Sequence, residues 1–179
     1  MTPASRNSGA IVPEPRSPGQ PYRICLVCLG NICRSPMAEV VLRGELDKAG
    51  LARKVAVDSA GTGDWHLGEP MDPRAMAELA RRGYSGSGHE ARQIQPSWLD
   101  DYDLLLALDH RNLTSLQRMA AGDGGVMSRI ALLRSFEPDG AAGDEVPDPY
   151  YGGAAEYAEV FELVHAAARG LVGNLKAAL

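Results

Sequence analysis

Residues 22–36 read YRICLVCLGNICRSP and contain the clearest structural signals of the chain. Its first seven residues form a nearly continuous apolar run, which is typical of a strand buried on both faces of a sheet. Ser35 and Pro36 form a helix-start signal, because a hydroxyl can cap a helix and proline suits the first helical position. The stretch therefore predicts a buried strand over 22–28, a short loop, and a helix that Gly50 ends.

The rest of the chain continues this alternation of short apolar runs and amphipathic segments. We expect helices over 35–49, 72–83, 110–120 and 157–175, strands over 53–59, 103–108 and 129–133, and loops at 122–125 and 137–143. Such alternation predicts an α/β fold with right-handed crossovers and a parallel sheet covered by helices on both faces. Ligands of open sheets bind outside the carboxyl ends of the strands, and the first strand ends at Cys28.

The composition fits one domain. The chain has 179 residues, of which 45% are hydrophobic and 23% charged, and its net charge is −5. These values argue against a disordered polyelectrolyte and against a basic nucleic-acid binder. No apolar run, 104–108 included, approaches the ~18 to 20 residues of a membrane span. We therefore expect a soluble, cytoplasmic protein with no membrane or nucleic-acid partner.

The first 21 residues differ from the rest, since they hold five prolines among serine, glycine and arginine. This composition predicts a disordered tail over 1–21 and a globular domain over 22–179. A signal peptide would begin with positive charge followed by roughly 7 to 15 apolar residues, and the segment has neither. We therefore expect no export by the usual route.

The loop that follows the first strand, C-L-G-N-I-C-R-S over 28–35, has the composition of an anion site. Gly30 permits positive φ or close approach, and Asn31 tolerates the left-handed conformation, so the backbone N–H groups can converge on one anion. The positive end of the next helix should help to hold Cys28 as a thiolate. The planar fork of Arg34 matches two phosphate oxygens, and Ser35 can donate its hydroxyl to the thiolate.

Other interpretations of the cysteines are weaker. The three thiols lie between Cys25 and Cys33, and an odd, clustered set is not the disulfide framework of a secreted scaffold. Cys25 lies within the strand, where a buried cysteine acts as a small hydrophobe. Cys25 and Cys28 have thioredoxin-type spacing but do not begin a helix, and no second ligand pair supports zinc. A nucleotide-binding P-loop would need a lysine, which this loop lacks.

A thiolate that attacks a phosphate ester needs an acid to protonate the departing oxygen, and Asp148 is the candidate. It lies in the proline-stiffened sequence VPDPYYG of residues 146–152, just before the last helix. An Asp-Pro pair is by itself an ordinary turn or helix cap. Tyr150 and Tyr151 favour the functional interpretation, because exposed tyrosines beside an acid form a wall for a flat aromatic leaving group.

Taken together, these residues resemble the low molecular weight protein tyrosine phosphatases, and bacterial members in particular. The resemblance rests on VCLGNICRSP at 27–36 and DPYY at 148–151, and it extends over about residues 22–179. It includes DSAGT at 58–62, Trp65, DPR at 72–74, H-x-ARQ at 89–93 and LD at 108–109. The resemblance implies a four-stranded parallel sheet and a two-step hydrolysis of phosphotyrosine without metal or cofactor.

The resemblance also implies roles for individual residues. Cys28 would attack phosphorus, Arg34 would clamp the phosphate, and Asp148 would act first as general acid and then as general base. The phosphate loop would comprise Leu29, Gly30, Asn31, Ile32, Cys33, Arg34 and Ser35, and the substrate ring would contact Trp65, Tyr150 and Tyr151. Asn31, Ser35, Ser59 and His89 would form a hydrogen-bond network that supports the loop. Cys33 could form a reversible disulfide with Cys28 and so protect it from over-oxidation.

Three alternatives share this fold or loop. Arsenate reductases use further cysteines downstream, and this chain has none after Cys33. Phosphoarginine phosphatases tend to carry a threonine where this chain has Ile32, whose bulk favours the flat phosphotyrosine ring. A phosphate-binding module without catalysis would lack the nucleophile, the arginine or the acid. We therefore expect a monomeric phosphatase that acts on tyrosine-phosphorylated proteins.

Overall fold

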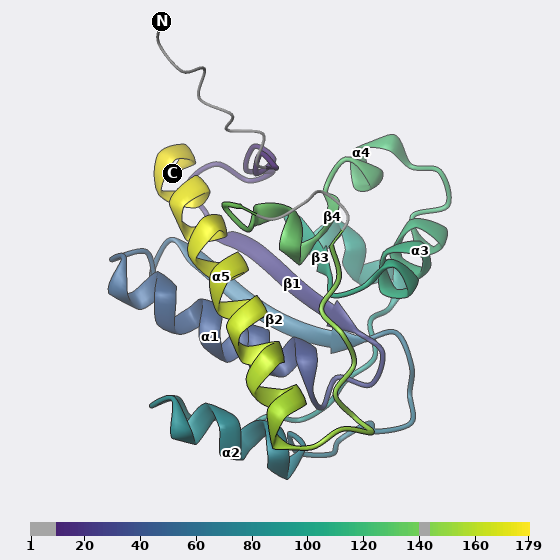
Figure 1. Ribbon diagram of the computed structural model, residues 1–179. Helices are drawn as coiled ribbons and strands as arrows, with labels where there is room; N and C mark the ends of the chain where they lie inside the picture. Colours follow the sequence, from purple (N-terminus) through teal and green to yellow (C-terminus); the bar gives the residue numbers. More distant parts are fainter. Residues whose placement is uncertain (1–9, 140–143) are drawn as a thin grey trace, which may run out of the picture.

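The computed structural model describes residues 10–139 and 144–179, and its centre is a four-stranded parallel sheet (Figure 1). The strands are β1 (Tyr22–Cys28), β2 (Val55–Gly61), β3 (Leu104–Ala107) and β4 (Ile130–Leu132), arranged in the order β2-β1-β3-β4. The first strand pairs with β2 along its whole length and with β3 over 24–27. The predicted α/β fold with a four-stranded parallel sheet is confirmed.

The helices are α1 (Arg34–Lys48), α2 (Pro73–Arg81), α3 (His110–Met119), α4 (Gly124–Met127) and α5 (Ala154–Ala178), with 3-10 turns η1 (Pro96–Asp101) and η2 (Leu133–Phe136). Aspartates cap three of the helices, but the predicted cap of the first helix is wrong: α1 begins at Arg34, Cys33 makes no side-chain capping bond, and the Ser35 hydroxyl contacts Cys28 and Ala60 instead. Asp72 accepts a hydrogen bond from Arg74 N at the start of α2, and Asp109 accepts one from Asn112 N at the start of α3. The sequence predicted only a loop at 122–125, where Asp123 caps the short helix α4.

Helices cover both faces of the sheet, as predicted. Successive residues of a strand point to opposite faces. Ile24 and Leu26 therefore pack with α1, α2 and α5, while Cys25 and Val27 pack with η1, α3 and α4. In Figure 1, α5 crosses in front of the strands, and α3 and α4 lie to the right. Cys25 is fully buried in the second of these cores, as expected for a structural cysteine.

One glycine of α5 permits a close contact between two elements. A Cβ atom on Gly170 would overlap the carbonyl oxygen of Phe136, the last residue of η2. Gly173, one turn along the same helix, has open space where its Cβ would lie. Glycine at position 170 therefore lets α5 pack directly on the backbone of η2, whereas position 173 makes no such demand.

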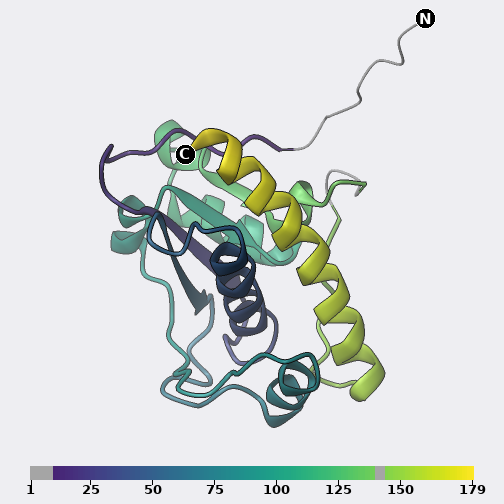
Figure 2. The same ribbon diagram turned by 90° about the vertical axis from the view of Figure 1, so that its left-hand side faces the viewer.

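Residues 10–21, which belong to the segment predicted as a disordered tail, pack on the domain. Val12 is buried, Ala10 O accepts a hydrogen bond from Asn174 Nδ2 at 3.1 Å, and Arg16 N donates to Asp103 Oδ1 at 2.7 Å. Figure 2 shows this segment running past the C-terminal end of α5. Residues 1–9 lie outside the described part of the chain.

The strand order determines where the site lies. Because β2 and β3 flank β1 on opposite sides, the chain leaves β1 at the point where the connections diverge. Such switch points form the ligand crevice of open parallel sheets. The loop after Cys28 therefore lies where ligands bind in folds of this type. Among the described helices, none is both long and apolar enough to cross a bilayer.

Candidate active site

The backbone of the loop between β1 and α1 includes one non-glycine residue with a positive φ. Asn31 adopts a left-handed conformation with φ of 56°, while Gly30 provides close approach, since a Cβ there would lie 3.0 Å from the His66 ring. Neighbouring segments hold the loop from outside. Thr62 N, Gly63 N and Asp72 N donate hydrogen bonds of 2.9 Å to the carbonyl oxygens of Cys28, Leu29 and Ile32 respectively.

The side chain of Asn31 is the centre of a buried network beneath the loop. Its Nδ2 donates to Ser35 Oγ at 2.9 Å and to Ser59 Oγ at 3.0 Å, and its Oδ1 accepts from Arg92 N at 3.0 Å. Its backbone oxygen accepts a 2.6 Å hydrogen bond from His89 Nε2. These contacts satisfy both ends of the amide and hold Asn31 in its left-handed conformation, which costs free energy for a residue other than glycine.

The thiol at the centre of the loop contacts this network directly. Cys28 Sγ lies 2.9 Å from Ser35 Oγ, and the residues are 3% and 0% exposed. Because Asn31 Nδ2 donates to the Ser35 oxygen, the hydroxyl proton has two acceptors within reach, the Ala60 oxygen at 3.3 Å and the Cys28 sulfur. It can point at a sulfur that carries negative charge.

Arg34 is buried at the start of α1 and is held by three groups. Its Nη1 lies 2.6 Å from Asp109 Oδ2 and 3.1 Å from the Val146 oxygen, and its Nη2 lies 3.5 Å from Asp148 Oδ2. Burial lowers the pKa of Arg34, but the negative charges of Cys28, Asp109 and Asp148 outweigh burial and raise it above its ordinary value. The guanidinium is therefore charged and held in a fixed orientation.

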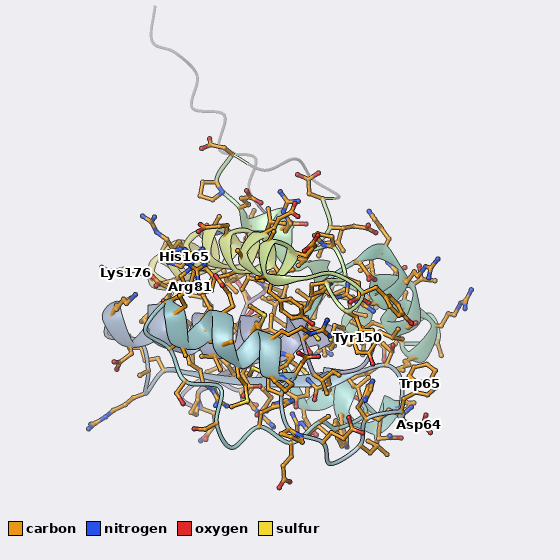
Figure 3. All side chains as sticks on the ribbon, turned by 60° about the horizontal axis from the view of Figure 1, so that its bottom comes forward. Asp64, Trp65, Arg81, Tyr150, His165 and Lys176 are labelled. Carbon is orange, nitrogen blue, oxygen red and sulfur yellow. The ribbon has the colours of Figure 1, made fainter. Side chains whose placement is uncertain are left out.

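One cavity of about 390 Å³ brings the predicted residues together. It is lined by residues 28–34, Trp65, His66, Asp148, Tyr150 and Tyr151. Trp65 and Tyr151 are 68% and 97% exposed, and the Tyr150 and Tyr151 rings meet edge to face with centroids 5.1 Å apart. Figure 3 shows Trp65 and Tyr150 on the same side of the molecule. The cavity thus has a polar floor and an aromatic rim.

Cys33 has a different environment from Cys28. Its Sγ lies 3.3 Å from the Tyr157 hydroxyl, and burial raises the pKa of its thiol to about 12. All three cysteines are free in this structure. The disulfide predicted between Cys28 and Cys33 remains a prediction about the oxidised protein. Within residues 10–139 and 144–179, no group of three or more metal-ligating side chains gathers in one place.

A family model described as low molecular weight phosphotyrosine protein phosphatase matches residues 23–179 of this sequence. The chain belongs to that family. A low molecular weight protein-tyrosine-phosphatase of Streptomyces coelicolor is 51% identical over 156 residues, which make up 87% of this chain and 94% of that protein. The protein is therefore an enzyme, a protein tyrosine phosphatase that resembles bacterial members of the family.

Solved structures of relatives have the same fold. The crystal structure of YfkJ from Bacillus subtilis matches with a TM-score of 0.82 at 38% identity, covering 90% of this chain and 98% of that one. A protein tyrosine phosphatase from Entamoeba histolytica, with Hepes in its active site, also reaches 0.82, at 31% identity. That match covers 87% of this phosphatase and 97% of the other chain.

Sequence reasoning missed several residues that support the site of this phosphatase. Asp109 holds Arg34, Glu39 accepts a hydrogen bond from Ser59, and Arg92 contacts Asn31. Asp109 and Arg92 lie in segments that carried the family resemblance, which was the available signal. Nothing in the pattern around Glu39 indicated a partner, because its contact with Ser59 joins α1 to β2 across the tertiary structure.

Proposed function

We propose that this phosphatase hydrolyses phosphotyrosine in proteins through a phosphocysteine intermediate, with Cys28 as nucleophile, Arg34 as phosphate clamp and Asp148 as general acid and base. The observation that carries the proposal is the shared cavity, in which a buried thiol, a charged guanidinium and a half-exposed carboxyl lie around one space. Two-step substitution needs these three groups together.

In the first step, Cys28 Sγ attacks the phosphorus atom of the bound ester. The backbone N–H groups of residues 29–34 and the Arg34 guanidinium bind the three equatorial oxygens, which carry the negative charge. An S–P bond forms while the bond from phosphorus to the phenolic oxygen breaks. Asp148 gives its proton to that oxygen, so the leaving group departs as neutral tyrosine.

In the second step, water hydrolyses the phosphocysteine. Asp148, now a carboxylate, accepts a proton from the water whose oxygen attacks phosphorus. The S–P bond breaks and its electron pair returns to sulfur. Ser35, whose Oγ lies 2.9 Å from Sγ, donates a hydrogen bond to the departing thiolate. Inorganic phosphate leaves, and the enzyme regains its starting protonation state.

The rim of the cavity supports an aryl ester as the substrate. Trp65, Tyr150 and Tyr151 present aromatic surface at the cavity mouth, and a phenyl ring can stack on such a wall. Ile32 also lines this cavity, and its bulk narrows the cavity so that a flat ring fits better than a thicker group. These features favour phosphotyrosine over a flexible alkyl phosphate or phosphoarginine.

The test is hydrolysis of an aryl phosphate in the presence of a metal chelator, with wild-type enzyme and Cys28→Ser. We expect wild-type turnover to persist with chelator and turnover by Cys28→Ser to be undetectable. A Cys25→Ser variant is the matched control, because Cys25 lies in the core on the opposite face of β1. Full activity of Cys28→Ser would overturn the assignment of the nucleophile.

A further inference from the structure

Arg74, in the first turn of α2, is partly exposed and yet forms hydrogen bonds with three other residues. Its side chain is 40% exposed, yet its Nε and Nη2 donate to the two carboxylate oxygens of Asp72 at 3.0 and 2.9 Å. Such a two-point contact fixes the plane of a guanidinium. Asp72 raises the pKa of Arg74 above its ordinary value, so the group is charged.

Through Asp72 and Tyr157, Arg74 is joined to the phosphate loop. Asp72 N donates to Ile32 O at 2.9 Å, which ties the start of α2 to the loop backbone. Arg74 Cζ also lies 4.9 Å from the centre of the Tyr157 ring, whose hydroxyl lies 3.3 Å from Cys33 Sγ. The position of Arg74 is therefore set relative to the loop that contains Cys28.

The Nη1 atom of the same guanidinium, which does not contact Asp72, reaches residues 148–152, the segment that contains Asp148. It donates to Tyr150 O at 2.9 Å and to Gly152 O at 3.1 Å, and Arg74 Cζ lies 5.6 Å from the Tyr150 ring centre. Tyr150 N in turn donates to Asp148 Oδ1 at 3.1 Å. A single residue, Tyr150, therefore links Arg74 to the carboxyl group that we assign as the acid.

Few other hydrogen bonds hold this segment, although Pro149 is buried and the Tyr150 ring centre lies 6.2 Å from that of His66. Val146 N is bonded to Leu108 O, and Gly153 N is bonded to Glu156 Oε2, so its two ends are anchored. Between them, the contact of Asp148 with Arg34 is 3.5 Å and the Asp148 side chain is 48% exposed. Among the described residues, the hydrogen bonds that reach 149–152 from outside the segment come from Arg74.

We propose that Arg74 is a positioning residue, which holds residues 148–152 against the phosphate loop so that the Asp148 carboxyl meets the leaving oxygen. The inference rests on the proposed function of Asp148. A guanidinium suits this role because its planar fork can bind the Asp72 carboxylate on one edge and two carbonyl oxygens on another. A lysine ammonium at position 74 would supply the charge but not this fixed geometry.

The role predicts a dependence on the leaving group. Protonation by Asp148 matters more for phenyl phosphate, whose phenol is a poor leaving group, than for p-nitrophenyl phosphate. We expect Arg74→Ala to lower kcat/KM for phenyl phosphate by about tenfold or more, since displacement of a catalytic group by ~1 Å can cost ~10² in rate. For p-nitrophenyl phosphate the loss should be less than about threefold, because its leaving group needs less protonation. Arg74→Lys should behave nearly like Arg74→Ala.

A double variant tests whether Arg74 acts through Asp148. If it does, Arg74→Ala should cause no further loss of kcat/KM for phenyl phosphate when added to Asp148→Ala. Arg81→Ala is the matched control, because Arg81 lies on the same helix, binds Glu78, and is labelled in Figure 3 at the opposite end of the molecule from Tyr150. The control should keep the wild-type ratio of the two substrates.

The possible outcomes separate this inference from the proposed function. Equal losses for both substrates with Arg74→Ala, or additive losses in the double variant, would overturn the positioning role while leaving Asp148 as the acid. If wild-type enzyme hydrolyses neither aryl phosphate, the proposed function itself fails. Thermal unfolding of each variant shows whether a loss of activity reflects loss of folded protein, and Arg74→Lys, which keeps the charge, provides a second folded variant for the same comparison.

Discussion

Arg34 Nη1 and Asp109 Oδ2 lie 2.6 Å apart, with their side chains 4% and 17% exposed. The contact joins the first residue of α1 to the residue that caps α3, and thus the two sides of β1. The carboxylate pairs with the charged guanidinium and orients it beside the cavity that Arg34 lines. The pair therefore contributes both to stability and to the geometry of phosphate binding.

Removal of this carboxylate should damage stability and activity together. Asp109→Ala should lower the free energy of unfolding by about 2 to 4 kcal/mol, because it deletes a helix cap and leaves a buried guanidinium with fewer partners. It should also lower kcat/KM for aryl phosphates by about tenfold or more, through misplacement of Arg34. Asp109→Asn keeps an oxygen that can cap α3 and should lose less stability. Urea unfolding and steady-state kinetics measure the two effects, and wild-type kinetics for Asp109→Ala would contradict the role.

Loss of the acid should slow turnover without abolishing it. Proton transfer by a positioned carboxyl raises the rate by about 10²- to 10⁴-fold, so Asp148→Ala should lower kcat by about that factor and leave measurable turnover. Rapid-quench measurements on phenyl phosphate should show slow formation of the phosphoenzyme. Glu159→Ala, which removes an exposed carboxylate on α5, should leave the rate unchanged. A loss below threefold for Asp148→Ala would assign the proton donor to another group.

Substrate preference should depend on Ile32. Wild-type enzyme should cleave a phosphotyrosine peptide faster than a phosphoarginine peptide, because the isoleucine side chain narrows the cavity. Ile32→Thr should shift the ratio of the two kcat/KM values toward phosphoarginine. Release of inorganic phosphate from matched peptides gives both numbers. Faster phosphoarginine cleavage by the wild-type enzyme would show that Ile32 does not set the preference.

Alkaline pH should destabilise the fold, beginning near the ordinary pKa of a cysteine thiol. Burial raises the pKa of the Cys25 and Cys33 thiols to about 12, and burial also raises the pKa of Tyr22, Tyr102 and Tyr157. The unfolded chain then binds fewer protons than the folded chain, so the free energy of unfolding falls as pH rises from about 9 toward 12. Urea midpoints measured at about pH 7.5, 9 and 10.5 should change little between the first two values and fall at the third. A constant midpoint across this range would contradict the burial of these groups.

Two glycines of α5 should respond oppositely to the same substitution. Gly170→Ala should destabilise the protein by about 1 to 3 kcal/mol, because the new Cβ overlaps the Phe136 carbonyl oxygen and the helix must shift. Gly173→Ala should stabilise it by about 0.5 to 1 kcal/mol, since that position is open and alanine favours the helix. Thermal or urea unfolding of the two variants compares them directly. Equal effects would mean that α5 does not pack closely on η2.

Local patterns were sufficient for much of the fold. The alternation of apolar runs and amphipathic segments depends on neighbouring residues, so the four strands and four of the five helices were predicted near their observed positions. The exception is α4, because four residues that contain two glycines carry too little periodicity to indicate a helix. The sequence also predicted no contacts for residues 10–21, since proline-rich composition does not reveal that Val12 packs on the core.

The strand and the loop over 22–33 were predictable from local sequence, because the apolar run and the Gly-Asn pair act through their own backbone, and the predicted helix start lies one residue from the observed start at Arg34. This local signal also identified the chemistry of a cysteine and an arginine around an anion. The distant residues that support this cysteine and arginine became apparent in the folded chain. Asp109 meets Arg34, and Arg74 meets Tyr150, across 75 and 76 positions of the chain. The partner in such a contact is selected by sheet order and helix packing, which no local pattern encodes.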